Sequence, residues 1–240
     1  MEKDWEELPK TFTPAVRKRV LSDWQKCLPN LILNRGTLDY LIGPLLISIG
    51  FDIRLGHDLY RPTFSVHNIL RDTEHLTATL NKILQTSRGT PECLTLRWHD
   101  KNYRDAAQRM KEQALIPLDH PTSLNCVLDV YKSFLEKEPY VSHIRYLNDL
   151  PTLAAWGGRD DIAKDMIAWG VQAYRELFGK SEEEATAWGL SMEEKIKDPE
   201  KLRQIAREQV AFHKLSKVPS CCFTDTPYQE CLTKVPFPKA

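Results

Sequence analysis

The sequence has no excess charge of either sign, because its 240 residues contain 33 Lys and Arg against 33 Asp and Glu. Proteins that bind nucleic acids or membrane surfaces usually present a positive field that attracts phosphate groups. A local basic patch would be compatible with this balance, but the long-range attraction is missing. We therefore expect neither a nucleic-acid partner nor a membrane partner.

The chain also lacks a hydrophobic run of the length that crosses a membrane or directs secretion. Its first nine residues contain no apolar core, unlike a secretory leader. The most apolar stretch, residues 41–55, is interrupted by Pro44, Ser48, Gly50, Asp52 and Arg54. The sequence therefore predicts a cytoplasmic location.

Short motifs for catalysis or metal binding are missing as well. There is no Cys-x-x-Cys pair, no His-x-x-x-His spacing, no Gly-rich phosphate loop and no Gly-x-Ser-x-Gly elbow. His-Asp dipeptides occur at 57–58 and 99–100, but a metal phosphohydrolase would need further His and Asp residues on neighbouring helices. We expect no metal, no cofactor and no catalytic residue, and we expect Asp100 to cap a helix.

The six cysteines predict reduced, structural thiols rather than a redox motif. Three of them fall inside expected helices or strands, where a free thiol behaves as a small hydrophobe. Cys221 and Cys222 are adjacent, and adjacent cysteines are usually only neighbours in a loop.

The sheet is predicted from a stretch of strict alternation. Between residues 45 and 55 every odd position is large and apolar, which places those side chains on one face of a strand. A turn at 56–58 leads to a second alternating run at 60–67, and a third lies at 93–98. These runs predict at least three mainly antiparallel strands with one covered face.

Helices account for the rest of the expected structure. Cap residues, prolines and helical spacing predict helix starts at Thr13-Pro14, Asp72-Thr73, Asp100, His120-Pro121, Asp160, Ser181 and Asp198-Pro199, with a shorter element over 146–156. A helix between the second and third strands could cross over the sheet, so the strand order stays open. No strand is expected after residue 100.

These elements predict an α+β fold, with a small antiparallel sheet in the N-terminal half covered by helices and an all-helical C-terminal half. We expect one compact domain over residues 1–218, with its sheet at about 1–100 and its helical part at about 101–218. Residues 219–240 carry four prolines and little periodicity, which is typical of a strap or a frayed end.

Charge is uneven in the helical half. Carboxylates gather around the starts of two expected helices, and their simplest explanation is a solvated face that complements the helix dipoles. The sharper hypothesis is an acidic surface for a basic protein partner, formed by Asp160, Asp161, Asp165, Glu182, Glu183 and Glu184.

The hairpin at 60–68, the segment 113–119 and the helical end resemble bacterial immunity proteins of polymorphic toxin systems, across roughly residues 40–180. Such toxins are delivered by type VI secretion or contact-dependent systems. The resemblance implies a protein without enzymatic activity that occludes a cognate toxin, for example a nuclease, by stoichiometric binding.

Three functional hypotheses follow for the chain. The first is toxin neutralisation through the acidic residues, with the hairpin residues His57, Asp58 and Arg61 as the alternative contact surface. The second is a hydrolase that uses polar residues near the hairpin, namely His57, Arg61, His67 or His99. The third is an adaptor that binds through its helical half, and a homodimer is compatible with all three.

Overall fold

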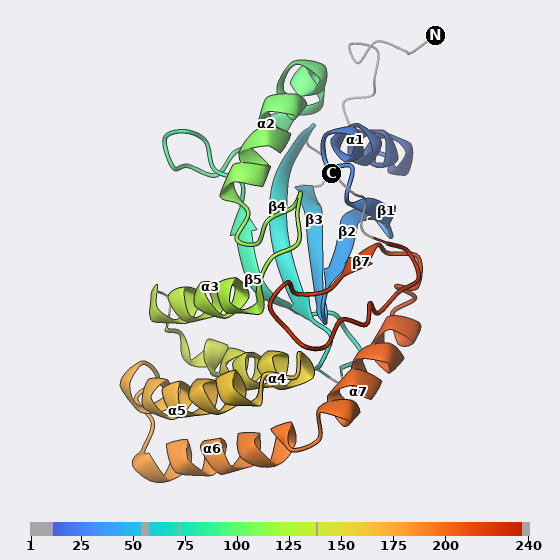
Figure 1. The fold of residues 1–240 in the computed structure, drawn as a ribbon. Coiled ribbons are helices and arrows are strands. Elements are labelled where there is room, and N and C mark those ends of the chain that lie inside the picture. Colours follow the sequence, from blue (N-terminus) through green and yellow to red (C-terminus); the bar gives the residue numbers. More distant parts are fainter. Residues whose placement is uncertain (1–11, 54–57, 72, 138, 237–240) are drawn as a thin grey trace.

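The computed structural model describes residues 12–53, 58–71, 73–137 and 139–236, and its fold is α+β (Figure 1). The strands are β1 (Ile32–Asn34), β2 (Thr37–Ile42), β3 (Leu45–Ile53), β4 (Leu59–Asn68), β5 (Ala78–Ile83), β6 (Leu94–Thr95) and β7 (Ser220–Cys221). The α-helices are α1 (Pro14–Cys27), α2 (His99–Gln113), α3 (Leu124–Lys137), α4 (Asp149–Trp156), α5 (Asp160–Glu176), α6 (Glu182–Ile196) and α7 (Pro199–Phe212). Short 3₁₀ segments, η2 (Leu96–Trp98) and η3 (Val141–Asn148), precede α2 and α4.

The strands form one sheet in the order β1-β2-β3-β4-β5, in which all neighbours are antiparallel. The strand expected at 45–55 is confirmed as β3, which lies in the middle and pairs along its whole length with β4. The turn between β1 and β2 uses Arg35 and Gly36, both at positive φ (47° and 93°), as a tight two-residue hairpin requires.

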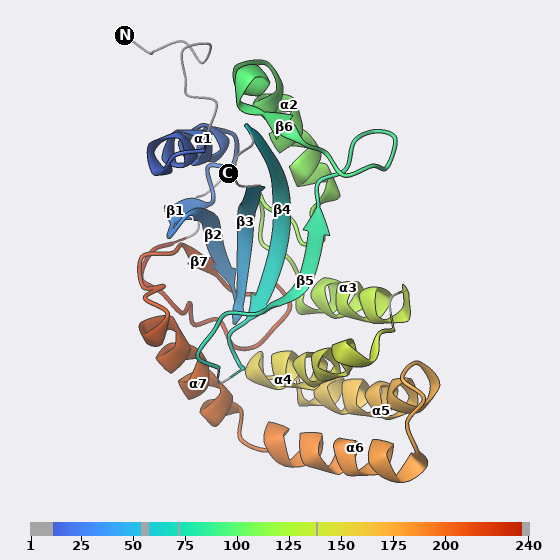
Figure 2. The ribbon, with the colours of Figure 1, turned by 180° about the vertical axis from the view of Figure 1, so that it is seen from behind.

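One face of the sheet carries the hydrophobic core. Ile47 and Ile49 of β3 are fully buried, and Ile49 lies between Leu38 of β2 and Phe64 of β4. The opposite face is more polar, and in the view from behind no helix lies over the middle of its strands (Figure 2). Asp52 is exposed there, as expected, whereas Arg54 lies outside the described residues. Ser48 on this face is nevertheless buried, so the simple rule of one buried face holds only in part.

The helix expected after Asp72-Thr73 is wrong, because residues 78–83 form strand β5. The apolar spacing of Leu76, Leu80, Ile83 and Leu84 does suit a helix. However, β4 would otherwise leave a row of backbone N–H and C=O groups without partners, and β5 pairs with it through a bulge at Val66/His67.

The third expected strand is much shorter than residues 93–98. Only Leu94 and Thr95 pair with β4, and the chain then turns through η2 into α2. Trp98 is therefore 43% exposed instead of buried. Helix α2 begins at His99, one residue before the expected cap Asp100, and Trp98 occupies its N-cap without a side-chain cap bond.

The tail contains a strand, β7, so the expectation of no strand after residue 100 is wrong. The tail is also not a frayed end. β7 runs parallel to β2, with Leu41 opposite Ser220 and Ile42 opposite Cys221. Phe223 follows and is fully buried beside Gly43, where an added Cβ would lie only 2.5 Å from the Phe223 ring. Residues 219–236 therefore dock onto the sheet.

The local signals for the other helices are confirmed. Thr13 caps α1 ahead of Pro14, and Asp198 caps α7 ahead of Pro199. Ser181 and Glu184 form the expected capping box of α6, and Gly179 adopts a φ of +63° at the end of α5. The cap residues expected from the sequence therefore lie at these helix boundaries.

The helices lie at both ends of the strands (Figure 1). α1 and α2 cover one end, and α3 to α6 stack as successive layers at the other, so that α6 is the outermost helix. α7 returns from α6 along the side of this stack and leads into the tail at the sheet (Figures 1 and 2).

We predict that Ile49→Asp unfolds the protein. The substitution places a carboxylate without a partner at the centre of the core, at a cost of about 4 kcal/mol or more, which is comparable to the total stability of many domains. Chemical denaturation monitored by circular dichroism will measure it. Asn81→Asp, at an exposed position of β5, is the matched control and should unfold like the parent protein. Equal stability of the two variants would contradict the placement of β3.

Candidate functional site

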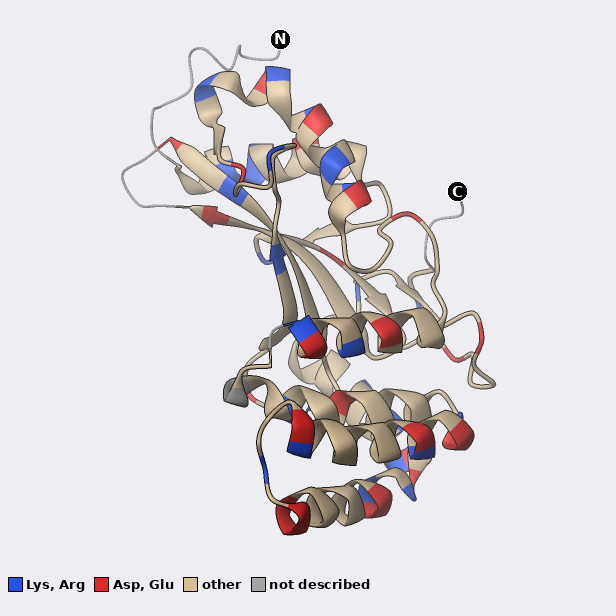
Figure 3. Cartoon of the chain, turned by 90° about the vertical axis from the view of Figure 1, so that its left-hand side faces the viewer, with Lys and Arg blue, Asp and Glu red and all other residues tan. Residues whose placement is uncertain are grey.

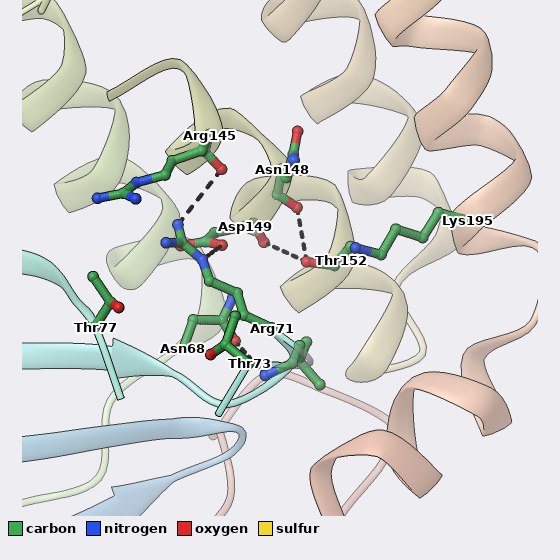
Figure 4. Close-up of a pocket in the computed structure, with 10 residues that line it drawn as sticks. Asn68, Arg71, Thr73, Thr77, Arg145, Asn148, Asp149, Thr152 and Lys195 are labelled. Atoms are coloured by element: carbon green, nitrogen blue, oxygen red, sulfur yellow. Dashed lines mark hydrogen bonds and ion pairs between the residues drawn. The ribbon is translucent and has the colours of Figure 1, made fainter. Parts of the chain in front are cut away.

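A polar cavity of about 250 Å³ lies where the sheet meets the helical half of the molecule (Figure 4). The end of β4 and the segment after it, the last turn of η3, helix α4 and the end of α6 contribute its lining. Its lining residues are Asn68, Leu70, Arg71, Thr73, Thr77, Arg145, Asn148, Asp149, Thr152 and Lys195.

The centre of the cavity is an ion pair between Arg71 and Asp149. Arg71 Nε and Nη2 donate to the two carboxylate oxygens at 3.0 and 2.9 Å, and only 2% of the Asp149 side chain is exposed. The guanidinium also lies 5.0 Å from the centre of the Tyr146 ring. Burial raises the pKa of Asp149, and the charge and hydrogen bonds of Arg71 oppose that rise.

Local structure brings these groups together from both halves of the chain. Asn68 Oδ1 accepts from the Leu70 amide at 2.9 Å, which turns the chain at the end of β4 and presents Arg71 to the helices. Asp149 lies in the first turn of α4, where the helix dipole favours a carboxylate. Asn148 beside it accepts from Trp188 Nε1 of α6 at 2.7 Å.

The side chains that line the cavity carry a net positive charge, because three of them, Arg71, Arg145 and Lys195, are cationic and only one is a carboxylate. Asp149 already neutralises Arg71. Asn68 Nδ2 is buried and makes no hydrogen bond of good geometry, although it lies near enough to Asp149 to lower its pKa. The arrangement suits a small group that accepts hydrogen bonds.

Of the four residues in the hydrolase hypothesis, the three that the structure describes do not come together. His57 lies outside the described residues, and Arg61 pairs with Asp52 on the polar face of the sheet. His67 lies on that same face, where burial lowers its pKa to about 4. His99 is fully buried and contacts Tyr60 on the core side of the sheet, so it lies on the opposite face from His67.

His99 belongs to a buried polar chain that joins α1, β4 and α2. Tyr60 Oη and His99 Nδ1 are 2.7 Å apart, and His99 Nε2 lies 3.5 Å from an oxygen of Asp23. Burial opposes the ionisation of Asp23, but hydrogen bonds from His99 and Lys26 outweigh it and lower the pKa of this carboxyl. Trp24 Nε1 donates to Tyr60 Oη at 3.3 Å, so the chain fixes α1 against the sheet.

The six carboxylates of the acidic hypothesis form two groups instead of one. α5 and α6 pack antiparallel, so Asp160, Asp161 and Asp165 lie at one end of the pair and Glu182–Glu184 at the other (Figure 3). The 17 residues of α5 span about 25 Å. The two groups therefore cannot act as one compact patch.

Several of these carboxylates have cationic neighbours. Asp161 pairs with Arg159 at 2.8 Å, Glu182 with Arg175 at 2.6 Å and Glu184 with Lys180 at 3.1 Å. Asp160, Asp165 and Glu183 have no ion pair within the described residues. The pairs are largely exposed, and pairs of this kind contribute little to stability. Hydrogen bonds from Arg159 lower the pKa of Asp161 to about 2, so this group stays charged at neutral pH.

An apolar groove runs between α5 and α6. Its volume is about 450 Å³, and its lining includes Ile167, Ala168, Val171 and Leu190, with Lys164 and Glu193 at its border. Leu190 is 62% exposed although it is a large apolar side chain. The close approach of the two helices depends on Gly170, whose added Cβ would lie 2.3 Å from the ring of Trp188.

Two further expectations concern metals and membranes. Within the described ranges, no three His, Cys, Asp or Glu side chains are grouped closely enough to hold a metal ion. Among the helices built from those residues, none has the length and apolar character needed to cross a membrane.

Comparison with known proteins adds no relative: no protein-family model, no curated protein and no solved structure matches this chain.

Sequence reasoning missed Arg71 and Asp149, which are 78 residues apart in the chain. Neither residue belongs to a motif. The only local signal was the expected short helix over 146–156, in which a carboxylate in the first turn is common. The groove was also missed, because an exposed leucine cannot be recognised from helical spacing alone.

We predict that Arg71→Gln lowers the free energy of unfolding by about 3 to 5 kcal/mol at pH 7, because it leaves a buried carboxylate without its cation. Adding Asp149→Asn in the same chain should recover much of that loss, since the remaining amides carry no charge. Urea denaturation of the two variants and the parent measures both effects. Arg61→Gln, which breaks an exposed pair, is the control and should cost less than about 1 kcal/mol.

The pH dependence of this loss has a defined sign. The pKa of Asp149 in the folded protein lies above its usual value of 3.8. Protonation of Asp149 therefore stabilises the fold below pH 3.8, and this stabilisation is lost as the pH rises through the pKa of the folded protein. Removing Arg71 raises the folded pKa further. The deficit of Arg71→Gln relative to the parent should therefore shrink between pH 7 and pH 4. A deficit that does not change with pH would contradict a buried, charged Asp149.

Proposed function

We propose that the chain is a protein-binding module of the immunity type, which neutralises a cognate toxin by stoichiometric occlusion. The observation that carries the proposal is the acidity of the α5–α6 pair. Residues 160–196, from the start of α5 to the end of α6, contain nine Asp and Glu against four Lys and Arg, a formal charge of −5 in a chain whose total is zero. This pair also forms the outer layers of the helical stack (Figure 1).

The groove between α5 and α6 adds an apolar contact to this charge. Protein interfaces commonly combine an apolar centre with a polar, charged rim. Here Leu190 and its apolar neighbours lie between the two acidic ends of the helix pair. An exposed leucine in such a groove favours a protein partner over a small polar ligand.

The proposed partner is a toxin with a basic surface, such as a nuclease. An enzyme that binds nucleic acid needs cationic side chains around its active site, and opposing carboxylates speed its encounter with an inhibitor and discriminate against other partners. The ion pairs Arg175–Glu182 and Lys180–Glu184 are exposed, so exchanging them for contacts to the partner costs little.

The direct test uses the protein encoded by the gene next to this one. Its expression alone should stop growth of a host cell, and co-expression of this chain should restore growth and yield a 1:1 complex on gel filtration. A harmless neighbouring product, or toxicity that persists without any complex, would overturn the proposal.

We predict that Glu182→Gln, Glu183→Gln and Glu184→Gln together slow association with the toxin by about tenfold at low salt and reduce its salt dependence. The fold should survive, because Gln can replace Glu in the capping box and the lost dipole support is worth about 0.3 to 1 kcal/mol per charge. Stopped-flow binding at two salt concentrations measures the effect. A second triple variant removes the carboxylates at the other end of the helix pair, through Asp160→Asn, Asp161→Asn and Asp165→Asn.

A matched control removes three exposed carboxylates from α2, at Asp100, Asp105 and Glu112. This control has the same change in net charge but lies at the far end of the molecule, so it should bind almost like the parent. Equal binding by all three triple variants would reject α5–α6 as the interface. The hairpin around Asp58 and Arg61 would then become the surface to test.

A further inference from the structure

Two cysteine side chains meet in the docked tail. Cys222 Sγ and Cys231 Sγ are 3.4 Å apart, although nine positions separate the residues in the chain. Both are free thiols, and Cys231 is exposed whereas Cys222 is partly buried.

Hydrogen bonds outside the thiol pair hold the two ends of this segment together. Ser220 and Thr233, two positions outside each cysteine, are joined by a bond of 3.0 Å between their hydroxyls. Thr233 Oγ1 lies 2.7 Å from the Val218 carbonyl, and Ser220 also belongs to β7. The tertiary structure therefore places the thiols together before any bond forms between them.

The segment between the cysteines is also packed and not a free loop. Phe223 and Tyr228 make edge contacts with the ring of Trp156, at centroid distances of 6.2 and 4.9 Å. Gln229 Nε2 donates to the carbonyl of Phe223 at 3.0 Å, which closes the segment on itself. A cross-link between its ends would preserve this conformation.

We propose that Cys222 and Cys231 form a modification site that a low-molecular-mass disulfide, such as oxidised glutathione, converts into an intramolecular disulfide. The sulfurs must approach from 3.4 Å to the bonding distance of about 2.05 Å, a small movement for an exposed side chain such as Cys231. The inference does not depend on the proposed function.

The reaction proceeds in two exchange steps that balance. The Cys231 thiolate attacks one sulfur of oxidised glutathione, which forms a mixed disulfide and releases one glutathione thiolate. The Cys222 thiolate then attacks Cys231 Sγ and releases the second glutathione. Two protein thiols are oxidised, one small disulfide is reduced to two thiols, and two protons move from the cysteines to the departing thiolates.

Exposure decides the order of attack. Burial and the neighbouring Cys231 raise the pKa of Cys222 to about 12, so Cys222 is a poor first nucleophile at neutral pH. The exposed Cys231 is therefore the first nucleophile, and the exchange should accelerate as the pH rises from 7 to 9, because a larger share of the thiols is then thiolate.

Cys221 provides an internal control, because it is adjacent to Cys222 but faces the sheet. Its Sγ lies 3.7 Å from the Leu41 carbonyl, and burial raises its pKa to about 12. It should stay reduced while its neighbour is oxidised.

The experiment incubates the purified full-length protein with oxidised glutathione and maps the product by mass spectrometry. We expect a cross-linked peptide pair containing Cys222 and Cys231 that has lost two hydrogens, and alkylation of Cys221 only after unfolding. Glutathione adducts on Cys93 and Cys126, which are also exposed, do not bear on this cross-link. Cys221→Ser should give the same cross-link between Cys222 and Cys231. Cys222→Ser should stop at the glutathione adduct on Cys231.

Oxidation should also raise the melting temperature of the parent by about 5 °C and leave that of Cys222→Ser unchanged, because only the parent closes the loop. Three results would overturn the proposal: a stable glutathione adduct on Cys231 in the parent, a cross-link that includes Cys221, or complete alkylation of both thiols after oxidation. Circular dichroism of each variant before oxidation verifies that it is folded.

Discussion

The buried ion pair between Arg71 and Asp149 is the interaction on which the two halves of the molecule depend. Arg71 leaves the end of β4, and Asp149 begins α4, the helix against which α5 and α7 pack. A carboxylate that is only 2% exposed would be costly without its cation, so any displacement of the helical stack from the sheet is penalised. The pair therefore ties the position of the helical stack to the end of β4.

The outermost helix depends on this junction indirectly. α6 packs on α5, and its Trp188 donates to Asn148, the residue before Asp149. The position of the α5–α6 pair, with its acidic ends and its groove, thus depends on successive contacts that connect it to the sheet. These contacts hold the carboxylates at defined separations, which would favour selectivity for the proposed basic partner.

The sheet has two different faces, and other elements are attached to it at both ends of its strands. Tyr60, His99 and Asp23 tie α1 and α2 to its core side, and the tail adds β7 beside β2 at the other end. The opposite face remains polar and free of helices over the middle of the strands (Figure 2). Binding through the helical stack and oxidation in the tail would therefore involve separate parts of one framework.

The sequence by itself determined the features that depend on neighbours along the chain. The alternation at residues 45–53, the caps at Thr13 and Asp198 and the capping box at Ser181 all predicted their elements, and together they predicted the α+β class. Only the tertiary structure decided that residues 78–83 are a strand, since the open edge of β4 outweighed their helical spacing. It also decided that the acidic residues divide between two ends of a helix pair, that Arg71 meets Asp149 and that Cys222 meets Cys231. Arg71 and Asp149 are 78 positions apart and meet only because the elements between them pack together, whereas the two thiols, nine positions apart, meet because the tail docks onto the sheet.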